Sequence, residues 1–347
     1  MSLAPKHILI TGGSGYIGKI SQYYFHNRGY PTFNIDNNSA GTKPLFLARY
    51  QDISVCDIEK LHHLFRQYKF DVVIHLAGAI SVQESIDKPH IYETNNVIGS
   101  QNLLEAMRGH CDKIIFASTA SVYGNTNYPV SEEDNVSPNS PYGLSKLRVE
   151  KALQQAVTHG ISSIAFRLFN VCGALISKQS IENSKTQYSL GKESLPAFHI
   201  IPTMLQKLMH QEAFEVFGTE HNTHDGTCVR DYIHVLDVIK ALEMGINFLN
   251  QQHSIAPAHH CFNIGSGIGL SVLDIIQSVE RVTQHTIAYK IQPPRIGDIN
   301  FSVANIQKVK ETLGWAPTYS SIQNILKDCW QHQQLYYQRY SEQNPLV

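Results

Sequence analysis

The chain has 347 residues, with 28 Lys and Arg against 29 Asp and Glu, and a formal net charge of -1. Its hydrophobic fraction of 42% and charged fraction of 16% are typical of globular proteins and exclude disorder as the overall state. Because a basic excess is missing, sequence-independent nucleic-acid binding is not expected, and any phosphate must be recognised by a few local groups.

Membrane insertion, secretion and metal binding are also not indicated. No apolar run approaches the roughly 18 residues that span a bilayer. The first residues lack a signal-peptide core, so a cytoplasmic location is the default expectation. The six Cys form no C-x-x-C motif and the 18 His no H-E-x-x-H motif. Reduced thiols and packing or surface histidines are therefore favoured over disulfides or a metal site.

The first half of the chain alternates short apolar runs with segments of helical periodicity. Runs such as Val72, Val73 and Ile74 are typical of strands in a sheet covered on both faces. Strands that alternate with helices of this length indicate βαβ units and a parallel sheet. The predicted strands are His7–Thr11, Pro31–Asp36, Phe70–Ala77, Lys113–Thr119 and Ser163–Asn170, and the predicted helices cover 17–28, 59–68, 92–108 and 141–159.

The composition changes between residues 174 and 198, where Ser, Lys, Gln and Asn dominate and periodicity disappears. This segment is predicted to be a loop that crosses between domains. A second αβ region follows. Its predicted elements are a helix whose first turn holds Pro202, a strand over Cys261–Gly265, a helix near 272–284 capped by Ser271, and an amphipathic C-terminal helix from about Ser321.

The sequence therefore predicts an α/β fold with two parts. The first, residues 1–173, is a doubly wound parallel sheet of the Rossmann type. The second, mainly residues 174–347, is a smaller αβ domain, and the site is expected in the cleft between them.

A glycine-rich turn follows the first predicted strand. Gly12, Gly15 and Gly18 have G-x-x-G-x-x-G spacing, and Gly13, Gly15 and Gly18 also satisfy G-x-G-x-x-G. Glycines allow a tight turn and let the backbone approach a pyrophosphate, which then lies at the helix N-terminus. A glycine motif alone is weak evidence, but its place between a strand and a helix predicts a dinucleotide site.

Two carboxylates are placed to contact such a dinucleotide. Asp36 ends the second predicted strand, where a carboxylate accepts from the ribose 2′-hydroxyl and repels a 2′-phosphate, so NAD is preferred over NADP. The alternative is that Asp36 only caps a turn. Asp57 is a candidate for the adenine, and an N-cap for the helix that follows is nearly as well supported.

The segment from Pro141 to Lys146 holds a Y-x-x-x-K motif at the start of a predicted helix. Tyr142 and Lys146 are one turn apart and so share a face. The pKa of a phenol is about 10, and Lys146 and an oxidised nicotinamide are cations that would lower it. Tyr142 is therefore predicted to be a catalytic base, with a surface helix pair as the alternative.

A second hydroxyl group is expected near this pair. Thr119 ends the fourth predicted strand, at the carboxyl edge where α/β sites form. Its hydroxyl can bond the substrate oxygen that Tyr142 deprotonates. By chemistry alone, Ser118 and Ser121 compete for the same role.

These motifs resemble the extended short-chain dehydrogenase/reductase superfamily, and within it the UDP-glucose (UDP-galactose) 4-epimerase family. The resemblance covers nearly the whole chain, with its segments in family order, and is more specific than any single motif. The segments that carry it are Thr11–Gly18, His75–Gly78, Glu84 with Ser85, Asn95–Val97, Ser118–Gly124, Ser140–Lys146, Arg167–Asn170, Asp225–Thr227, Val229–Val235, Asn263–Gly267 and Arg295–Asp298.

The resemblance implies which residues act. Thr119, Tyr142 and Lys146 match the catalytic positions. Those matching NAD-binding positions are Gly12, Gly15, Tyr16, Ile17, Asp36, Asn37, Asp57, Ile58, Leu76, Ala77, Gly78, Asn95, Ser118, Tyr142, Lys146 and Phe169. Those matching substrate-binding positions are Thr119, Tyr142, Asn170, His199, Ile200, Phe217, Arg230, Arg295, Asp298 and Ser302.

The resemblance also implies a reaction. Tyr142 would take the proton of the sugar 4′-hydroxyl while hydride leaves C4′ for NAD, the 4-ketose would rotate, and hydride would return to its other face. Arg230 and Arg295 would hold the diphosphate of the UDP, a role that suits arginine chemically. The alternative for Arg230 is an ion pair with Asp231. Segments after Arg230 are expected to return to the first domain.

Departures from the family pattern concern the sugar. Ala120 and Ser121 stand where dehydratases carry an acidic pair, so dehydration is not expected, and Ile80 and His221 replace a usual Lys and Tyr. Ser302 aligns with a position beside the sugar where a Tyr narrows the pocket. A small residue would leave room for a 2-acetamido group, although neighbouring Phe301 could fill it.

Two other functions stay open. One is another NAD-dependent nucleotide-sugar enzyme, such as a uronic-acid 4-epimerase or decarboxylase. The other is an idle NAD-sensing protein, which the fold alone would permit. The family also implies a homodimer that packs through the helices near 92–108 and 141–159.

Overall fold

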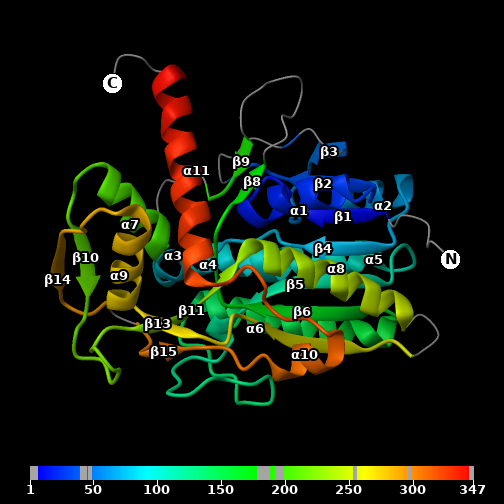
Figure 1. The fold of residues 1–347 in the computed structure, drawn as a ribbon. Coiled ribbons are helices and arrows are strands. Elements are labelled where there is room, and N and C mark those ends of the chain that lie inside the picture. The colour runs from blue at the N-terminus through cyan, green and yellow to red at the C-terminus, as the bar shows by residue number, and fades with distance from the viewer. Residues whose placement is uncertain are drawn as a thin grey trace.

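A computed structural model describes residues 7–39, 45, 49–177, 188–192, 199–252, 256–295 and 298–343. Its largest element is a seven-stranded sheet in which every neighbouring pair is parallel (Figure 1). The strand order is β12-β6-β5-β4-β1-β2-β3, which confirms the predicted doubly wound sheet. Its strands are β1 (Ile8–Thr11), β2 (Thr32–Asp36), β3 (Arg49–Asp52), β4 (Val72–His75), β5 (Lys113–Thr119), β6 (Ser162–Leu168) and β12 (His259–Ile264).

Helices cover both faces of this sheet. Alternate residues of one strand face opposite sides, so Ile8 and Ile10 pack in one core and Leu9 in the other. Both cores are apolar, which explains why the sheet strands are apolar at consecutive positions. One face carries α1 (Tyr16–Asn27) and α8 (Val235–Gln251), and the other carries α2 (Ile58–Gln67), α5 (Gly99–Met107) and α6 (Pro141–Ala156).

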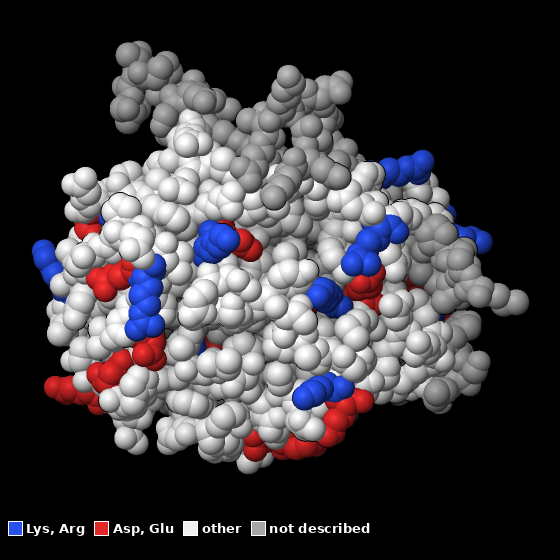
Figure 2. All heavy atoms as spheres, in the orientation of Figure 1, with Lys and Arg blue, Asp and Glu red and all other residues white. Residues whose placement is uncertain are grey.

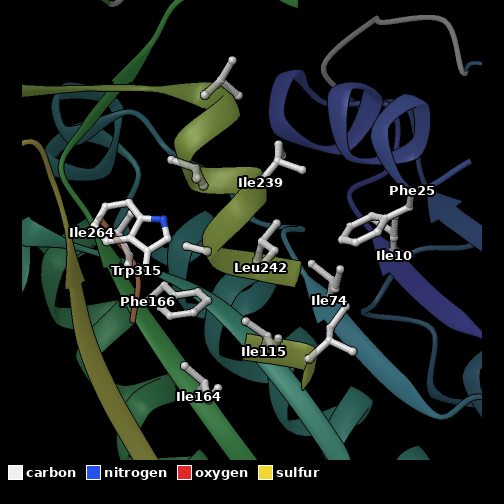
Figure 3. Close-up of a cluster of buried hydrophobic side chains, with 14 of the residues drawn as sticks. Ile10, Phe25, Ile74, Ile115, Ile164, Phe166, Ile239, Leu242, Ile264 and Trp315 are labelled. Carbon is white, nitrogen blue, oxygen red and sulfur yellow. The ribbon is translucent and has the colours of Figure 1, made fainter. Parts of the chain in front are cut away.

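The core on the α1 and α8 face is the larger apolar contact of the sheet. Figure 3 shows Ile239 and Leu242 of α8 above the strand residues Ile74, Ile115 and Phe166. The helix α8 therefore fastens a late part of the chain onto the N-terminal sheet. The apolar period of α8 was present in the sequence but was not among the predicted elements.

Later segments build a second region. It contains a sheet of β7 (Asn170–Cys172), β11 (Val229–His234), β13 (Gly269–Ser271) and β15 (Phe301–Ser302), and a parallel pair of β10 (Phe214–Phe217) and β14 (Tyr289–Gln292). A separate core joins its helices to β10. The helices are α7 (Ile200–Met209), α9 (Val272–Thr283) and α11 (Ile322–Gln343), with α10 (Gln307–Leu313) beside β12.

Several predicted boundaries are corrected. The predicted helix at 92–108 begins with a π-helical turn, Glu93–Ile98, after the short helices α3 (Val82–Asp87) and α4 (Pro89–Tyr92). The predicted helix at 141–159 ends its α-helical part at Ala156, and a 3₁₀ turn follows. The prediction that Pro202 lies in the first turn of a helix is confirmed, since α7 begins at Ile200.

The predicted strand Ser163–Asn170 is also wrong at its end. The strand β6 stops at Leu168, because Asn170 pairs with Tyr232 of β11 in the other sheet. The chain therefore changes sheets at Phe169. This change places Asn170 between the two regions.

The predicted loop at 174–198 is in part regular structure. Strand β8 (Leu175–Ser177) pairs antiparallel with β9 (Tyr188–Leu190), and Ser177 bonds Tyr23 of α1 at 2.7 Å. The prediction for 178–187 and 193–198 falls outside the described residues. The helix cap at Ser271 is confirmed, with a full capping box to Asp274.

The surface and the thiols add two observations. Figure 2 shows Lys and Arg interspersed with Asp and Glu on the face that it draws. No helix in the described part of the chain has the length and apolar character to span a membrane. All six Cys are free thiols, and four of them are buried, as predicted, whereas Cys56 and Cys261 are partly exposed.

Candidate active site

The glycine-rich turn lies between β1 and α1. Gly12 has φ +72, and a Cβ there would lie 2.7 Å from the Ala77 backbone nitrogen. A Cβ on Gly18 would lie 2.2 Å from the Gly12 carbonyl oxygen. Gly15 is the N-cap of α1 and supplies no side-chain cap, so the helix presents backbone N–H groups to a ligand. This geometry forms an anion-binding helix N-terminus.

We expect Gly18→Ala to lose the bound dinucleotide, because the added methyl group forces the turn open at the helix N-terminus. The measurement is the NAD released by heating the purified protein. Gly29→Asn is the matched control, since a Cβ at Gly29 meets nothing within 4 Å and Asn tolerates its φ of +75. Wild-type NAD content in Gly18→Ala would contradict this reading of the turn.

Asp36 is held by two backbone donors. Its Oδ2 accepts from the Ser14 nitrogen at 2.9 Å and its Oδ1 from the Asn38 nitrogen at 2.8 Å. The turn-capping role is therefore real, and it also joins β2 to the glycine-rich turn. Each carboxylate oxygen has further lone pairs, so these bonds leave acceptor capacity for a ribose hydroxyl. The neighbouring Asn37 accepts from the Ser39 nitrogen.

Asp57 is the N-cap of α2, which begins at Ile58. Its side chain accepts from the Lys60 nitrogen at 3.1 Å, and this backbone bond lowers the pKa of the carboxyl. The predicted N-cap role is confirmed. Close by, Cys56 donates from Sγ to Asn95 Oδ1 of the π-helical turn at 3.6 Å.

The segment after β4 is fixed by buried polar bonds. The Ala77 nitrogen donates to Thr11 Oγ1 at 3.2 Å, and Thr11 bonds His75 Nδ1 at 2.7 Å. Ser100 donates its hydroxyl to the Asn96 carbonyl, so it accepts from His75 Nε2. The neutral His75 ring therefore accepts at Nδ1, and Thr11 is the donor there. These bonds hold Leu76, Ala77 and Gly78 against the glycine-rich turn.

Asn96 fixes the next residues and was missed as a site residue. Its amide bonds both backbone groups of Ala79 and donates to Ser145 of α6 at 3.0 Å. This side chain therefore joins the β4 end to the helix of the Y-x-x-x-K motif. Its place in the quoted segment Asn95–Val97 was the available signal.

The helix α6 positions Tyr142 and Lys146. Ser140 caps it by accepting from the Gly143 nitrogen at 3.1 Å, and Pro141 occupies its first turn. Lys146 is only 3% exposed, so the alternative of a surface helix pair is wrong. Its Nζ donates to the Ala117 carbonyl at 2.9 Å and lies 4.7 Å from the centre of the Phe116 ring.

Burial shifts both groups towards their neutral forms. It lowers the pKa of Lys146 to about 8, and Glu150 acts in the opposite direction. Burial raises the pKa of Tyr142, and a side-chain hydrogen bond with Thr119 acts to lower it. Among the three candidate hydroxyls of the described residues, Thr119 is the one that acts on the pKa of Tyr142.

The other two hydroxyls have different partners. Ser118 donates to the buried carboxylate of Glu150 at 2.5 Å. Ser121 accepts from Thr119 at 3.2 Å, and its backbone nitrogen donates to Thr119 Oγ1. At the end of β5, Thr119 therefore lies on the side of Tyr142, whereas Ser118 bonds Glu150.

Arg230 lies on β11 beside two other candidate residues. It pairs in strand register with Ser302, and its Nη2 lies 3.9 Å from Asp298 Oδ1. The suggested ion pair with Asp231 is wrong, because the buried Asp231 carboxylate accepts instead from Ser266, Gly267 and Ala304. Arg230 therefore keeps donors for a ligand.

The remaining substrate candidates lie in three places. The Arg295 guanidinium stacks 3.7 Å from the centre of the Phe217 ring. Asn170 donates to the Asp231 carbonyl at 3.0 Å, and Phe169 is buried at the change of sheets. His199 precedes Ile200 at the start of α7, and burial lowers its pKa to about 3. Within the described residues, no hydrogen bond or ion pair joins these groups to Tyr142.

The parallel sheet, the glycine-rich turn and the Tyr–Lys pair define a dinucleotide-dependent enzyme of the short-chain dehydrogenase/reductase class. The family model described as GDP-mannose 4,6 dehydratase matches residues 9–329. A UDP-glucose 4-epimerase of Halalkalibacterium halodurans is 34% identical over 344 residues, covering 97% of this chain and 98% of the relative. The chain belongs to the UDP-glucose 4-epimerase family of the extended short-chain dehydrogenases/reductases.

Solved structures of UDP-glucose 4-epimerases are similar to this fold as well. The UDP-glucose 4-epimerase of Bifidobacterium longum in complex with NAD+ and UDP has a TM-score of 0.81 at 30% identity, over 98% of this chain and 99% of that chain. The UDP-Glc/GlcNAc 4-epimerase of Campylobacter jejuni has a TM-score of 0.77 at 28% identity, over 95% and 99%. Both similarities extend over both regions of the fold.

Proposed function

We propose that this protein interconverts the C4 epimers of a UDP-hexose, UDP-glucose and UDP-galactose, through a transient 4-keto sugar, with NAD as its resident cofactor. One observation carries the proposal. The Thr119 hydroxyl, at the carboxyl end of β5, acts to lower the pKa of the Tyr142 phenol, and the buried Lys146 lies one turn further along α6. An idle binding protein would have no physical need for this arrangement.

The residues of the glycine-rich turn fit a dinucleotide. Gly12 and Gly18 allow a tight turn in which any Cβ would clash with neighbouring backbone, and the N-terminus of α1 lies in this turn with its backbone donors. We assign the ribose to Asp36 and the adenine to the region of Asp57 and Asn95. A dinucleotide held there would supply the hydride-transfer chemistry at C4′ of the sugar.

The proton chemistry belongs to three side chains. Tyr142 takes the proton of the 4′-hydroxyl and gives it back when the sugar is reduced again. Thr119 bonds the same oxygen and orients it towards the phenolate. Lys146 is a buried cation that stabilises the phenolate, because an opposite charge in a dry environment acts strongly.

The uridine diphosphate is held away from the reacting carbon. Arg230 and Arg295 supply cationic donors to the diphosphate, and Asp298 accepts from its ribose. Asn170, His199, Ile200 and Phe217 complete this part of the proposed site. Binding energy at this remote end allows the 4-keto sugar to turn while it stays bound.

The test is incubation of the purified protein with UDP-galactose, without added reductant, followed by chromatography of the products. We expect UDP-glucose to appear. Bound NAD without any conversion would contradict the proposal and would favour another nucleotide sugar or a binding role.

We propose that acetamido sugars are accepted as well. Ser302 is buried next to Arg230 in the sheet, where a small side chain leaves space beside the sugar. The Campylobacter jejuni neighbour is described with both kinds of sugar. We expect Ser302→Tyr to lose turnover of UDP-N-acetylgalactosamine and to keep that of UDP-galactose. Acetamido-sugar turnover that survives in Ser302→Tyr would contradict this reading.

We propose that the two parts of the chain bind different ligands. Residues 1–173, with segments around 230–265, bind the dinucleotide, and 174–347 mainly bind the nucleotide sugar.

We also propose that the protein is a homodimer. The partner is a second copy of the chain, because exposed apolar side chains gather on contacting elements, α3, the π-helical turn and α6. These side chains are Val82, Ile86, Ile98 and Leu144. A cytoplasmic location stays an expectation that cell fractionation tests.

We expect Leu144→Glu to convert the dimer to a monomer, because Leu144 is 50% exposed on α6 and a charge there is costly to bury. The measurement is the mass in sedimentation equilibrium. Tyr128→Glu, at an exposed residue outside these helices, is the control. A monomeric wild-type protein would contradict the dimer.

A further inference from the structure

Glu150 lies on α6 one turn beyond Lys146 and two turns beyond Tyr142. It is 5% exposed, although burying a carboxylate is costly unless strong partners compensate. The proposed chemistry does not use it. Its burial beside the Tyr–Lys pair therefore needs another explanation.

The partners of Glu150 form a buried network. Its Oε1 accepts from Ser118 Oγ at 2.5 Å and from Arg167 Nε at 3.1 Å, and its Oε2 accepts from Arg167 Nη2 at 2.8 Å. Arg167 also donates to the Tyr123 hydroxyl at 2.9 Å, which donates to Asn263 Oδ1 at 2.7 Å. These bidentate, charge-assisted bonds pair the buried carboxylate of Glu150 with the guanidinium of Arg167.

This network meets the catalytic elements at the end of β5. Ser118 immediately precedes Thr119, and Lys146 donates to the carbonyl of Ala117, the residue before Ser118. Lys146 and Glu150 thus bond consecutive residues of one strand from successive turns of one helix. The carboxylate fixes the strand that carries Thr119 against the helix that carries the Tyr–Lys pair.

Glu150 is also the nearby negative charge for Lys146. Burial lowers the pKa of Lys146 to about 8, and Glu150 opposes that shift. His75, from β4, is neutral here because burial lowers its pKa to about 3. Tyr142 adds no charge while its phenol is protonated, and burial favours that form because it raises the pKa of Tyr142.

The titratable groups near Glu150 come from the strands β6 and β12. Arg167 is its cationic partner on β6. On β12, burial lowers the pKa of His259 to about 4 and raises the pKa of Cys261, so both are uncharged at neutral pH. Arg167 is therefore the cation that contacts Glu150, and Glu132 and Lys308 also act on the pKa of Cys261.

We propose that Glu150 is a positioning residue of the active site, which places a negative charge one helical turn from Lys146 and holds Ser118 and Thr119 against α6. The inference rests on the proposed function, in which Lys146 acts as a cation beside the Tyr142 phenolate. An ammonium group beside a carboxylate keeps its proton to higher pH than it would alone. Activity therefore extends further into the alkaline range than burial alone would allow.

The test is the pH profile of kcat with UDP-galactose, measured on the full chain with its bound cofactor. We expect Glu150→Gln to move the alkaline limb to lower pH by about one pH unit or more. The KM should change little, because Glu150 does not touch the substrate. Glu150→Asp keeps the charge, so its alkaline limb should stay near the wild-type position even where kcat falls.

Ser118→Ala is the matched control, because it removes a bond to Glu150 without changing any charge. Its kcat is free to fall, but its alkaline limb should not move. If Glu150→Gln does not fold, the double variant Glu150→Gln/Arg167→Gln leaves neither buried charge unpaired. Its alkaline limb should again lie below that of the wild type, since Glu150 is the charge that acts on Lys146.

The outcomes separate this inference from the proposed function. A wild-type protein that does not epimerise UDP-galactose would overturn both. An active wild type with an unchanged alkaline limb in Glu150→Gln, or in the double variant, would overturn the inference alone. An equal shift in Ser118→Ala would overturn it too, because the cause would then be packing rather than charge.

Discussion

Replacing Tyr142 with Phe is expected to lower kcat for UDP-galactose epimerisation by roughly 100- to 10,000-fold, the usual contribution of a general acid–base group. The ring still fits, and its edge-on contact with Tyr92 at 6.2 Å is kept. Only the phenol hydroxyl, on whose pKa Thr119 acts, is lost. The KM and the bound NAD should therefore change little, and the measurement is kcat and KM by product chromatography.

Tyr128→Phe is the control for this substitution. Tyr128 is 55% exposed and lies outside the site, so its variant should turn over at the wild-type rate. Thr119→Ala should lose less than Tyr142→Phe, since Thr119 orients the oxygen but does not take its proton. A Tyr142→Phe variant with near wild-type kcat would show that another group is the base.

Replacing Asp231 with Ala is expected to lower the free energy of unfolding by roughly 3–5 kcal/mol, because four hydrogen bonds to its buried carboxylate would be lost at about 1 kcal/mol each. The carboxylate is fully buried on β11. It accepts from the backbone and hydroxyl of Ser266 and from the nitrogens of Gly267 and Ala304. These bonds join β11 to the segment after β12 and to the residues after β15.

The measurement is urea unfolding followed by circular dichroism. Asp87→Ala is the matched control, since Asp87 is exposed and should change the unfolding free energy by about 0.5 kcal/mol or less. A loss for Asp231→Ala no larger than that of the control would mean that Asp231 does not hold the two sheets together. Other contacts would then have to fix β11, the strand that carries the neighbouring Arg230.

The elements that the sequence predicts best are those with a strong local pattern. The strand β5 begins at Lys113 and ends at Thr119 as predicted, because an apolar run stops at two hydroxyl residues. The cap at Ser271 and the N-cap at Asp57 are local hydrogen bonds and follow from nearby residues. Local chemistry also led to the Tyr142 and Lys146 pair.

The rest depends on partners far away in the chain. The π-helical turn at 93–98 contains Asn96, whose amide bonds Ala79 and Ser145, and no local period indicates that turn. The short strands β13 and β15 exist only because β11 pairs with them. The end of β6 at Leu168 likewise depends on β11.

The buried network at Glu150 was missed for a similar reason. Arg167 appeared in the sequence only as part of a family segment, and its partner lies on another element. The signal that could have found Glu150 is its spacing, one turn after Lys146 on a helix whose buried face was already assigned. Spacing alone would not have shown that Ser118 is its other partner.

The central claim is that this active site removes a hydride from C4′ of the sugar and returns it to the same carbon. The most direct measurement uses UDP-galactose that carries deuterium at C4′, with the product analysed by NMR and mass spectrometry. The account predicts UDP-glucose that retains deuterium at C4′. Product that has exchanged the label for solvent hydrogen, or no product at all, would contradict it.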